Sequence, residues 1–268
     1  MKNKMKFFRI FLFLVCLLVF FFSCWQIFLY LKDVNVAKNQ NGKIIENVII
    51  PLSPGMSFSE NSSVKDETVS DSMYPDITVD LEKLKLSYPD ATGWLYCPST
   101  PIHYPVMQSA DNDYYLSRLP DGKKNPAGSL FVDCRFSSDF SGFGQIIYGH
   151  NMKNDTMFGT LLDYRNEDYF KNHPFLFYFT DSGIFRVELF AGVHTTSDSD
   201  FYVLPEEENE RNQYVKNAVK RSVFSSDIKV SGEDKILVLS TCSGNANEKK
   251  RFALMGKLVL IQDKSGQF

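Results

Sequence analysis

The longest apolar stretch of the chain lies at its N-terminus. Residues 7–31 carry a single charged side chain, Arg9. At about 1.5 Å per helical residue, such a stretch can cross a hydrocarbon layer of roughly 30 Å. Three lysines fall within the first six residues, and basic residues before a membrane segment favour a cytoplasmic N-terminus. The pattern predicts a single-pass anchor over residues 1–31, with the remainder of the chain on the extracellular side of the cell membrane.

A cleaved signal peptide is the competing interpretation of this stretch. The apolar core of a signal peptide is about 7 to 15 residues long and is followed by small residues at the cleavage site. Here the stretch is longer, and the bulky Trp25, Phe28 and Tyr30 stand where that site would be. The sequence therefore favours an anchor that stays attached.

Polar residues dominate the next segment, 32–75. It is rich in Asn, Ser, Lys and Asp, and Pro51, Pro54 and Gly55 interrupt it. A short apolar run at 44–50 has the composition to dock on a neighbouring element. Segments of this overall composition are typical of flexible spacers. We expect an extracytoplasmic stalk.

From residue 76 to 268 the pattern is that of a folded domain. A short helix is predicted at 79–87, because Pro89 disfavours helical conformation at the residue before it. Runs rich in β-branched and aromatic residues follow and predict strands at 93–97, 102–107, 129–133, 144–149, 175–180, 185–195, 236–241 and 251–261. Many such strands separated by turns favour a barrel or a sandwich over alternating βαβ units.

Two helices are expected among these strands. The first is predicted at 156–164, with its apolar residues on one face and Asp155 as the N-cap. The second is predicted at 205–224, with Pro205 in the first helical position, acidic residues at its start and basic residues near its end. Its apolar stripe indicates packing against the core.

Composition excludes some functions. The chain has 44% hydrophobic and 23% charged residues and a net charge of -3, so no basic surplus indicates a nucleic-acid partner.

Cys16 and Cys24 lie in the predicted anchor, whereas Cys97, Cys134 and Cys242 follow it. An odd number outside the membrane leaves at least one thiol unpaired or paired with another molecule. No spacing in the sequence indicates a zinc site or an EF-hand.

Cys242 ends a predicted strand and precedes a turn. The next strand begins at Arg251, so a hairpin would set these two residues opposite each other, with Cβ atoms about 4.5 to 5.5 Å apart. A guanidinium beside the sulfur would favour the thiolate and donate hydrogen bonds to the oxyanion of an acyl-transfer intermediate. The positions of the two residues in the sequence fit equally well with an alternative, in which Cys242 is an inert buried thiol and Arg251 is a surface charge.

Acyl transfer by a thiol also needs a group that donates and accepts protons, and histidine suits this role near neutral pH. His150 follows the apolar strand 144–149 and precedes a turn, as Cys242 does. His194, near the end of another strand, ranks second. We interpret His103 and His173 as structural.

The order of these residues along the chain separates families of cysteine enzymes. Papain-like peptidases carry the cysteine before the histidine, which is the reverse of the order here. Caspase-like enzymes place the histidine about 50 residues before a cysteine in a Q-A-C-x-G context. His150 lies much further than that from Cys242, and the context here is Ser-Thr-Cys-Ser-Gly.

Several motifs resemble those of the class B sortases. Residues 238–242 are similar to the sortase signature T-L-x-T-C, with valine in place of the first threonine, and residues 148–152 read Y-G-H-N-M, as in class B. Arg251 takes the place of the family's essential arginine, and the helix at 205–224 resembles the class B insertion. Further matches at 93–95, 104–106, 111–116 and 128–131 extend the resemblance over residues 76–262.

The resemblance implies a closed eight-stranded β-barrel and a cysteine transpeptidase. The site as interpreted requires no metal or cofactor, since arginine supplies the positive charge. Such enzymes cut a C-terminal sorting motif of secreted proteins, of N-P-x-T-x or S-P-x-T-x form, after the threonine. They hold the protein as a thioester and pass it to an amine of the cell-wall peptidoglycan. Cys242 would be the nucleophile, His150 the general acid and base, and Arg251 the oxyanion and substrate clamp. The resemblance implies substrate contacts from Asn112, Leu116, Ser199, Tyr202, Val203, Leu204 and Ser240.

Two alternatives stay open at this point. The same three residues would serve a peptidase that lets water, instead of an amine, resolve the thioester. A non-catalytic surface-binding module would need none of them. Activity that survives replacement or alkylation of Cys242 would favour the binding module.

Overall fold

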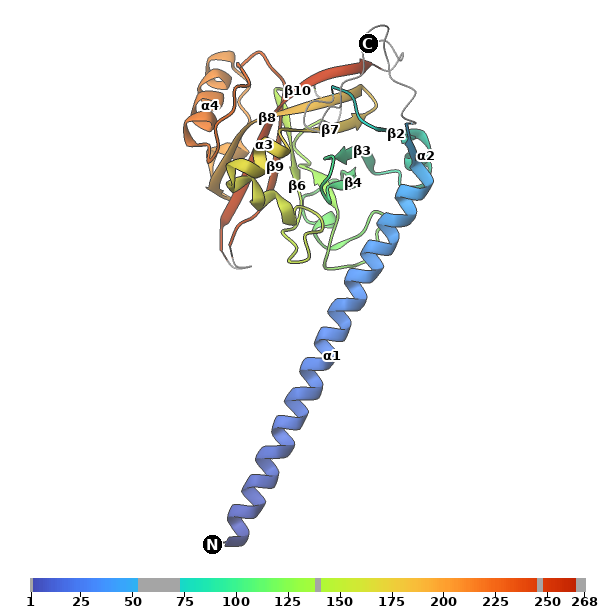
Figure 1. Ribbon diagram of the computed structural model, residues 1–268, viewed down its shortest axis with the longest axis vertical. Coiled ribbons are helices and arrows are strands. Elements are labelled where there is room, and N and C mark those ends of the chain that lie inside the picture. The colour runs from blue at the N-terminus through green and yellow to red at the C-terminus, as the bar shows by residue number, and fades with distance from the viewer. Residues whose placement is uncertain (1, 53–72, 138–140, 245–247, 264–268) are drawn as a thin grey trace. The chain divides into compact units, whose positions relative to one another are not determined.

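The computed structural model describes residues 2–52, 73–137, 141–244 and 248–263. The chain divides into two compact units, Met1–Lys43 and Ile44–Phe268. Helix α1 (Lys2–Val48) forms the first unit up to Lys43, and the second unit contains the last turn of α1 and the β-structure (Figure 1).

The first unit has the properties expected of a membrane anchor. Among the described residues, α1 is one helix long and apolar enough to cross a membrane. Its large apolar side chains, among them Phe13, Leu18 and Phe22, are exposed. An apolar surface of this kind suits a helix in contact with lipid.

The flexibility expected of the stalk is wrong for its first part. Residues 32–48 continue α1 instead of forming a flexible spacer. The physical reason is that no proline occurs between the anchor and Pro51, and the one glycine there, Gly42, weakens a helix without ending it. The central part of the predicted stalk, 53–72, lies outside the described residues.

The apolar run at 44–50 docks on the folded unit, which was the alternative noted for it. Ile44 and Val48 are buried together with Ile77 and Leu84. Strand β1 (Ile49–Pro51) then pairs antiparallel with β2 (Ile77–Val79). The second unit therefore begins with the last turn of α1.

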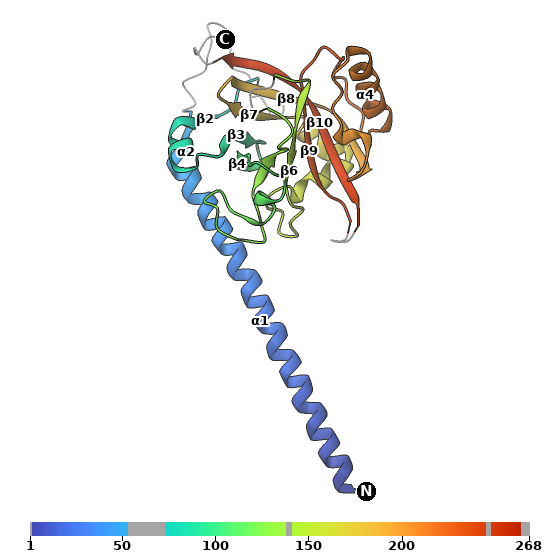
Figure 2. The same ribbon diagram turned by 180° about the vertical axis from the view of Figure 1, so that it is seen from behind.

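The second unit is built on a closed eight-stranded barrel, as expected (Figures 1 and 2). Its strands are β3 (Ala91–Tyr96), β4 (His103–Met107), β5 (Leu130–Val132), β6 (Gly144–Tyr148), β7 (Phe175–Thr180), β8 (Gly183–Thr196), β9 (Ile236–Cys242) and β10 (Lys250–Asp263). They follow the order β10-β8-β7-β3-β4-β5-β6-β9. The pairs β4–β5 and β6–β9 are parallel, and the other pairs are antiparallel.

Aromatic and branched side chains fill the barrel. Trp94, Phe177 and Phe179 are among the largest fully buried side chains, and each fully buried large apolar side chain contributes about 1.5 to 3 kcal/mol. Gly144 allows β6 to approach β9, because a Cβ there would lie within 2.3 Å of the Ile236 carbonyl oxygen. Closure of the barrel leaves neither β6 nor β9 as an open edge.

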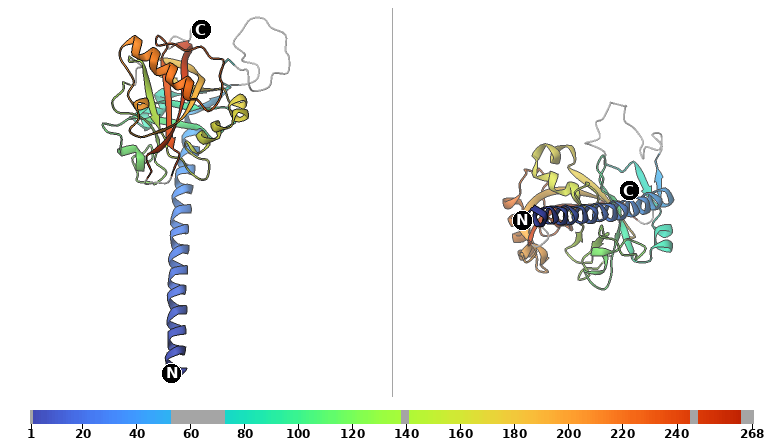
Figure 3. Two further views of the ribbon diagram at one scale, coloured as in Figure 1. Left: turned by 90° about the vertical axis from the view of Figure 1, so that its left-hand side faces the viewer. Right: turned by 90° about the horizontal axis from the view of Figure 1, so that it is seen from below.

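Helices surround the barrel. Helix α2 (Leu81–Ser87) begins at Asp80, whose side chain accepts a hydrogen bond from the Lys83 backbone amide at 2.9 Å. Helix α4 (Glu208–Arg221) lies beside β8 (Figures 1 and 3) and buries Tyr214, Val215 and Ala218 against the core. The remaining helices among the described residues are short: η2 (Tyr114–Ser117), η3 (Gly159–Arg165), α3 (Glu167–Asn172) and η4 (Asp200–Tyr202).

Two predicted helices differ from those observed. The expected α-helix at 156–164 is the 3-10 helix η3, and Asp155 is not its N-cap. Asp155 and Met157 have positive φ angles of 61° and 55°, which prevent a right-handed helix from starting there. Helix α4 starts after Pro205, at Glu208, so the proline does not occupy the first helical position.

Candidate active site

Three strand ends bring the predicted catalytic residues to one end of the barrel. Strands β6 and β9 run parallel with Tyr148 paired to Ser240, so the residues that follow both strands emerge together. His150 follows β6 and Cys242 ends β9. Strand β10 returns antiparallel and sets Arg251 directly opposite Cys242. The predicted hairpin register is confirmed.

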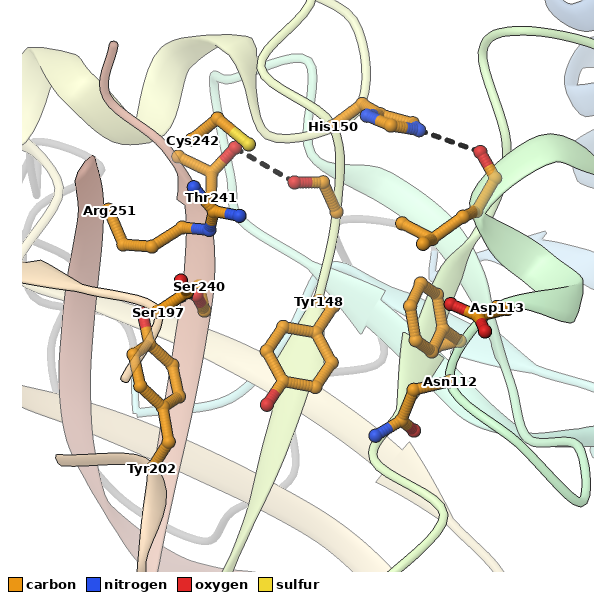
Figure 4. A pocket seen from close by; sticks show the side chains of 13 residues that line it. Asn112, Asp113, Tyr148, His150, Ser197, Tyr202, Ser240, Thr241, Cys242 and Arg251 are labelled. Atoms are coloured by element: carbon orange, nitrogen blue, oxygen red, sulfur yellow. Dashed lines mark hydrogen bonds between the residues drawn. The ribbon is translucent and has the colours of Figure 1, made fainter. Parts of the chain in front are cut away.

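A groove of about 270 Å³ opens at this end of the barrel (Figure 4). Figure 4 shows His150 on one side of Cys242 and Arg251 on the other. The complete lining consists of Asn112, Asp113, Leu116, Phe131, Tyr148, Gly149, His150, Ser197, Tyr202, Ser240, Thr241, Cys242 and Arg251.

The imidazole of His150 is held by the backbone of η2. Its Nε2 lies 2.7 Å from the Leu116 carbonyl oxygen (Figure 4). Since a carbonyl oxygen only accepts hydrogen bonds, Nε2 carries the proton in this arrangement. In the neutral imidazole Nδ1 is then the nitrogen that can accept a proton.

Two glycines make room around His150. A Cβ on Gly149 would lie 2.5 Å from Leu130 Cδ2 and 2.6 Å from Phe158 Cδ2, so a larger residue would displace the segment that carries the histidine. Gly128 has a φ of 62°, and a Cβ there would lie 2.7 Å from the Leu116 carbonyl oxygen. Both positions therefore favour glycine.

Hydrogen bonds join the histidine segment to the cysteine strand. The Asn151 side chain donates to the Cys242 carbonyl oxygen at 3.0 Å, and the Thr241 hydroxyl donates to the Gly149 carbonyl oxygen at 2.8 Å. Cys242 is half-buried, and all five cysteines are free thiols. Its sulfur therefore remains accessible at the mouth of the groove.

Arg251 is held by backbone carbonyl groups at and just before the start of β10. Its Nη1 donates to the carbonyl oxygens of Glu248 and Lys250 at 3.2 and 3.0 Å. The Nε and Nη2 groups make no hydrogen bond within the part of the chain that the structure describes. These N–H groups can serve an oxygen that develops negative charge beside Cys242.

A neutral, aromatic wall continues the groove away from the three polar residues. The hydroxyls of Tyr202 and Ser240 are hydrogen-bonded at 2.8 Å, and the rings of Tyr148 and Tyr202 stack with centroids 6.1 Å apart. Burial raises the pKa of Tyr202, although its hydrogen bond to Ser240 and the charge of Arg251 oppose the shift. Burial likewise raises the pKa of Tyr148. Both phenols are therefore protonated at neutral pH.

The predicted substrate-binding residues divide into two groups. Asn112, Leu116, Tyr202 and Ser240 line the groove together with the three catalytic candidates. Ser199 instead caps η4, and its hydroxyl accepts from the Phe201 backbone amide at 3.3 Å. Val203 is 64% exposed, and Leu204 packs partly buried against the core. These last three residues lie on the segment next to Tyr202 but outside the lining.

Sequence reasoning missed part of the lining, namely Asp113, Phe131, Tyr148, Gly149, Ser197 and Thr241. Strand alternation could have indicated Tyr148, because it lies two positions before His150 and shares its side of the strand. Ser197 and Phe131 reach the groove through closure of the barrel. No local pattern marks them.

The other histidines lie elsewhere. His103 packs against the rings of Trp94 and Tyr96, and burial lowers its pKa to about 4. His173 follows α3 as its C-cap. His194, on β8, lines a neighbouring hollow with Arg221. Within the described ranges, no group of three or more His, Cys, Asp or Glu side chains could hold a metal ion.

Comparisons with known proteins agree with this site. No known family model matches the chain. It is 36% identical to the sortase B of Listeria monocytogenes over 250 residues, which cover 92% of this chain and 94% of that protein. The solved sortase B of Bacillus anthracis has a TM-score of 0.69 at 26% identity, covering 86% of this chain and 99% of that one. The sortase B–substrate complex of Staphylococcus aureus has a TM-score of 0.65 at 27% identity, covering 68% and 85%.

The closed barrel with a free thiol at the end of β9, facing an arginine on β10, defines a cysteine transpeptidase of the sortase type. Within that class, the likeness to the Listeria protein extends over nearly the whole of both chains. The chain belongs to the sortase B family.

Proposed function

We propose that this enzyme cuts a C-terminal sorting motif of N-P-x-T-x or S-P-x-T-x form after its threonine and transfers the secreted protein to a peptidoglycan amine. The observation that carries the proposal is the convergence of Cys242, His150 and Arg251 on one groove. The relative from S. aureus has been solved with its substrate bound. The wall formed by Tyr148, Tyr202 and Ser240 carries no charge, which suits an uncharged segment of the peptide.

The first half of the reaction forms a thioester. The Cys242 thiolate attacks the threonine carbonyl carbon, and the N–H groups of Arg251 stabilise the oxyanion that results. The C–N bond breaks when His150 gives a proton to the leaving amine. The motif up to threonine remains bound to sulfur.

The second half releases the product. The acceptor amine attacks the thioester carbonyl, and His150 takes the proton that the amine loses. The C–S bond then breaks and the thiolate of Cys242 returns. Arg251 stabilises this second oxyanion as it does the first.

The remaining substrate contacts are part of the proposal. Asn112, Leu116, Tyr202 and Ser240 contact the motif from the walls of the groove. Ser199, Val203 and Leu204 contact it from the adjoining rim, on the segment that includes η4. Membership of the family supports these assignments, and the lining supports the first four.

Helix α1 anchors the enzyme at the membrane surface where its substrates meet. We infer that it crosses the cell membrane with its lysine-rich start in the cytoplasm, because basic residues near a membrane segment are retained there. The catalytic unit then lies on the cell-wall side, where secreted proteins and the peptidoglycan amine are both present. No step of the chemistry requires a metal or a cofactor.

Product analysis tests the proposal. Detergent-solubilised full-length enzyme is incubated with N-P-x-T-x and S-P-x-T-x peptides, with and without an amine acceptor, and the products are identified by mass spectrometry. The proposal predicts cleavage after threonine and, with amine present, a ligated product. Hydrolysis alone at every amine concentration would reject transfer, and products that persist in Cys242→Ala would reject the mechanism.

A further inference from the structure

Asp133 is a fully buried carboxylate that lies just outside the groove. It follows β5, and its side chain is 0% exposed. Its Oδ1 accepts hydrogen bonds from the backbone amide and Nε of Arg135 at 3.0 and 2.9 Å. Its Oδ2 accepts from Arg135 Nη2 at 2.6 Å and from the Tyr148 hydroxyl at 2.9 Å. The carboxylate is thus surrounded by donors.

These donors keep the buried group ionised. Burial raises the pKa of Asp133, but the hydrogen bonds from Arg135, Asn112 and Tyr148 outweigh it, so the pKa lies below its ordinary value. A buried charge is tolerated only when it is paired and hydrogen-bonded. Removing that charge would leave the surrounding donors without their common acceptor.

The partners of Asp133 belong to the walls of the groove. Tyr148 lines it and donates to the carboxylate directly, and Asn112 lines it and helps to lower the pKa of the carboxylate. Asn112 is also held from its other end, since its Oδ1 accepts from the Cys134 backbone amide at 2.8 Å.

The link to Tyr202 runs through Arg135. Its Nη2 donates to the Tyr202 carbonyl oxygen at 3.0 Å while it also bonds to Asp133. Figure 4 shows Tyr148 between Tyr202 and Asn112. One carboxylate therefore connects three lining residues that come from three separate segments of the chain.

We propose that Asp133 is the positioning residue that sets the width of this groove and so controls binding of the sorting peptide. The inference rests on the proposed function. Asp133 does not belong to the groove lining, which includes Cys242, His150 and Arg251. Its loss should act on peptide affinity, because recognition depends on walls held in place by supporting hydrogen bonds. A merely structural role would lower stability without selective loss of affinity.

Asp133→Asn tests the proposal, since it keeps the shape and removes the charge. For motif-peptide cleavage, KM should rise about 10- to 100-fold, as expected for losing a charge-assisted hydrogen-bond network. The kcat and the rate of Cys242 alkylation by iodoacetamide should stay within about threefold of wild type. Tyr148→Phe, which removes one of these bonds, should raise KM less.

Asp234→Asn is the matched control. Asp234 is likewise a carboxylate paired with a cation, Lys257 at 2.9 Å, although it is only partly buried, and it lies before β9, outside the groove lining. This variant should lose stability with an unchanged KM. If Asp133→Asn behaves in the same way, or lowers kcat with KM unchanged, the positioning role is rejected.

A crystal structure of Asp133→Asn separates this inference from the proposed function. Displaced side chains of Asn112, Tyr148 and Tyr202 support the positioning role even if wild type cleaves no motif peptide. Unchanged positions of all three overturn it even if wild type is fully active. Failure of the wild-type enzyme to cleave any motif peptide counts against the proposed function only.

Discussion

The two sides of the groove are built differently. Cys242, His150 and Arg251 are half-buried residues at strand ends, held mainly through hydrogen bonds to the backbone. The opposite wall, with Tyr148, Tyr202 and Ser240, is connected through side chains to one another and to the buried Asp133. Reactive groups stay accessible and adjustable, whereas the surface that recognises the peptide is fixed. The comparison predicts that substitutions on the first side affect kcat and substitutions behind the second side affect KM.

Removal of the thiol gives the largest expected effect. Cys242→Ala should lower the rate of motif-peptide cleavage by about 10⁴-fold or more, because no other group forms the covalent intermediate. Circular dichroism should show an unchanged fold. Cys134→Ala, at an exposed thiol outside the lining, serves as the control and should retain activity. Comparable rates in both variants would contradict the assignment.

Replacement of the arginine comes next. Arg251→Lys keeps the charge but loses the planar fork of N–H donors, so kcat should fall by about 10²- to 10³-fold with a smaller change in KM. Steady-state kinetics measure both constants. Arg165→Lys, on η3, should leave them unchanged. A rise in KM at constant kcat would show that Arg251 binds the ground state instead.

Crowding the histidine segment should affect stability. Gly149→Ala places a Cβ within 2.5 Å of Leu130 Cδ2, and overpacking of this kind costs about 1 to 3 kcal/mol in the free energy of unfolding. Thermal or urea unfolding measures the loss. Gly142→Ala is the control, because its Cβ would meet no atom within 4 Å. Equal stabilities for the two variants would refute the steric argument.

The smallest effect concerns acid stability. The pKa of Asp133 is lowered in the folded protein, so its contribution is present above the unfolded pKa of about 3.9 and is lost as pH falls through the folded value. Urea unfolding of wild type should therefore weaken between pH 5 and pH 3 more steeply than that of Asp133→Asn. Parallel pH profiles would show that the carboxylate does not contribute.

Local pattern was sufficient for the strands and for the pairing of Cys242 with Arg251, but it left a barrel and a sandwich both open. Each strand carries its own β-branched or aromatic signal, and the short loop between β9 and β10 fixes the register that pairs Cys242 with Arg251. The resemblance to the sortases was needed to predict that the strands close into a barrel and which further residues contact the substrate. Asn112 and Ser240 from that set line the groove, and their contacts with substrate stay a prediction.

The length of α1, the start of η3 and the contacts of Asp133 could not be predicted, because they depend on the conformation and packing of the folded chain. The segment 32–48 has a spacer-like composition, yet it contains no proline to end the helix before it. The start of η3 is displaced by the positive φ angles of Asp155 and Met157, which neither residue type signals. Asp133 resembles any acidic residue after a strand. Arg135 is a local partner two residues further on, whereas Asn112 and Tyr148 meet it only in the folded barrel.

Trapping of the covalent intermediate tests the central claim most directly. Full-length enzyme in detergent is mixed with a motif peptide without acceptor amine, quenched in acid and digested, and the peptide that contains Cys242 is weighed by mass spectrometry. The account predicts that this peptide gains the mass of the motif fragment ending in threonine, and that hydroxylamine removes it. An unmodified Cys242 during active cleavage, or an adduct on another residue, would contradict the account.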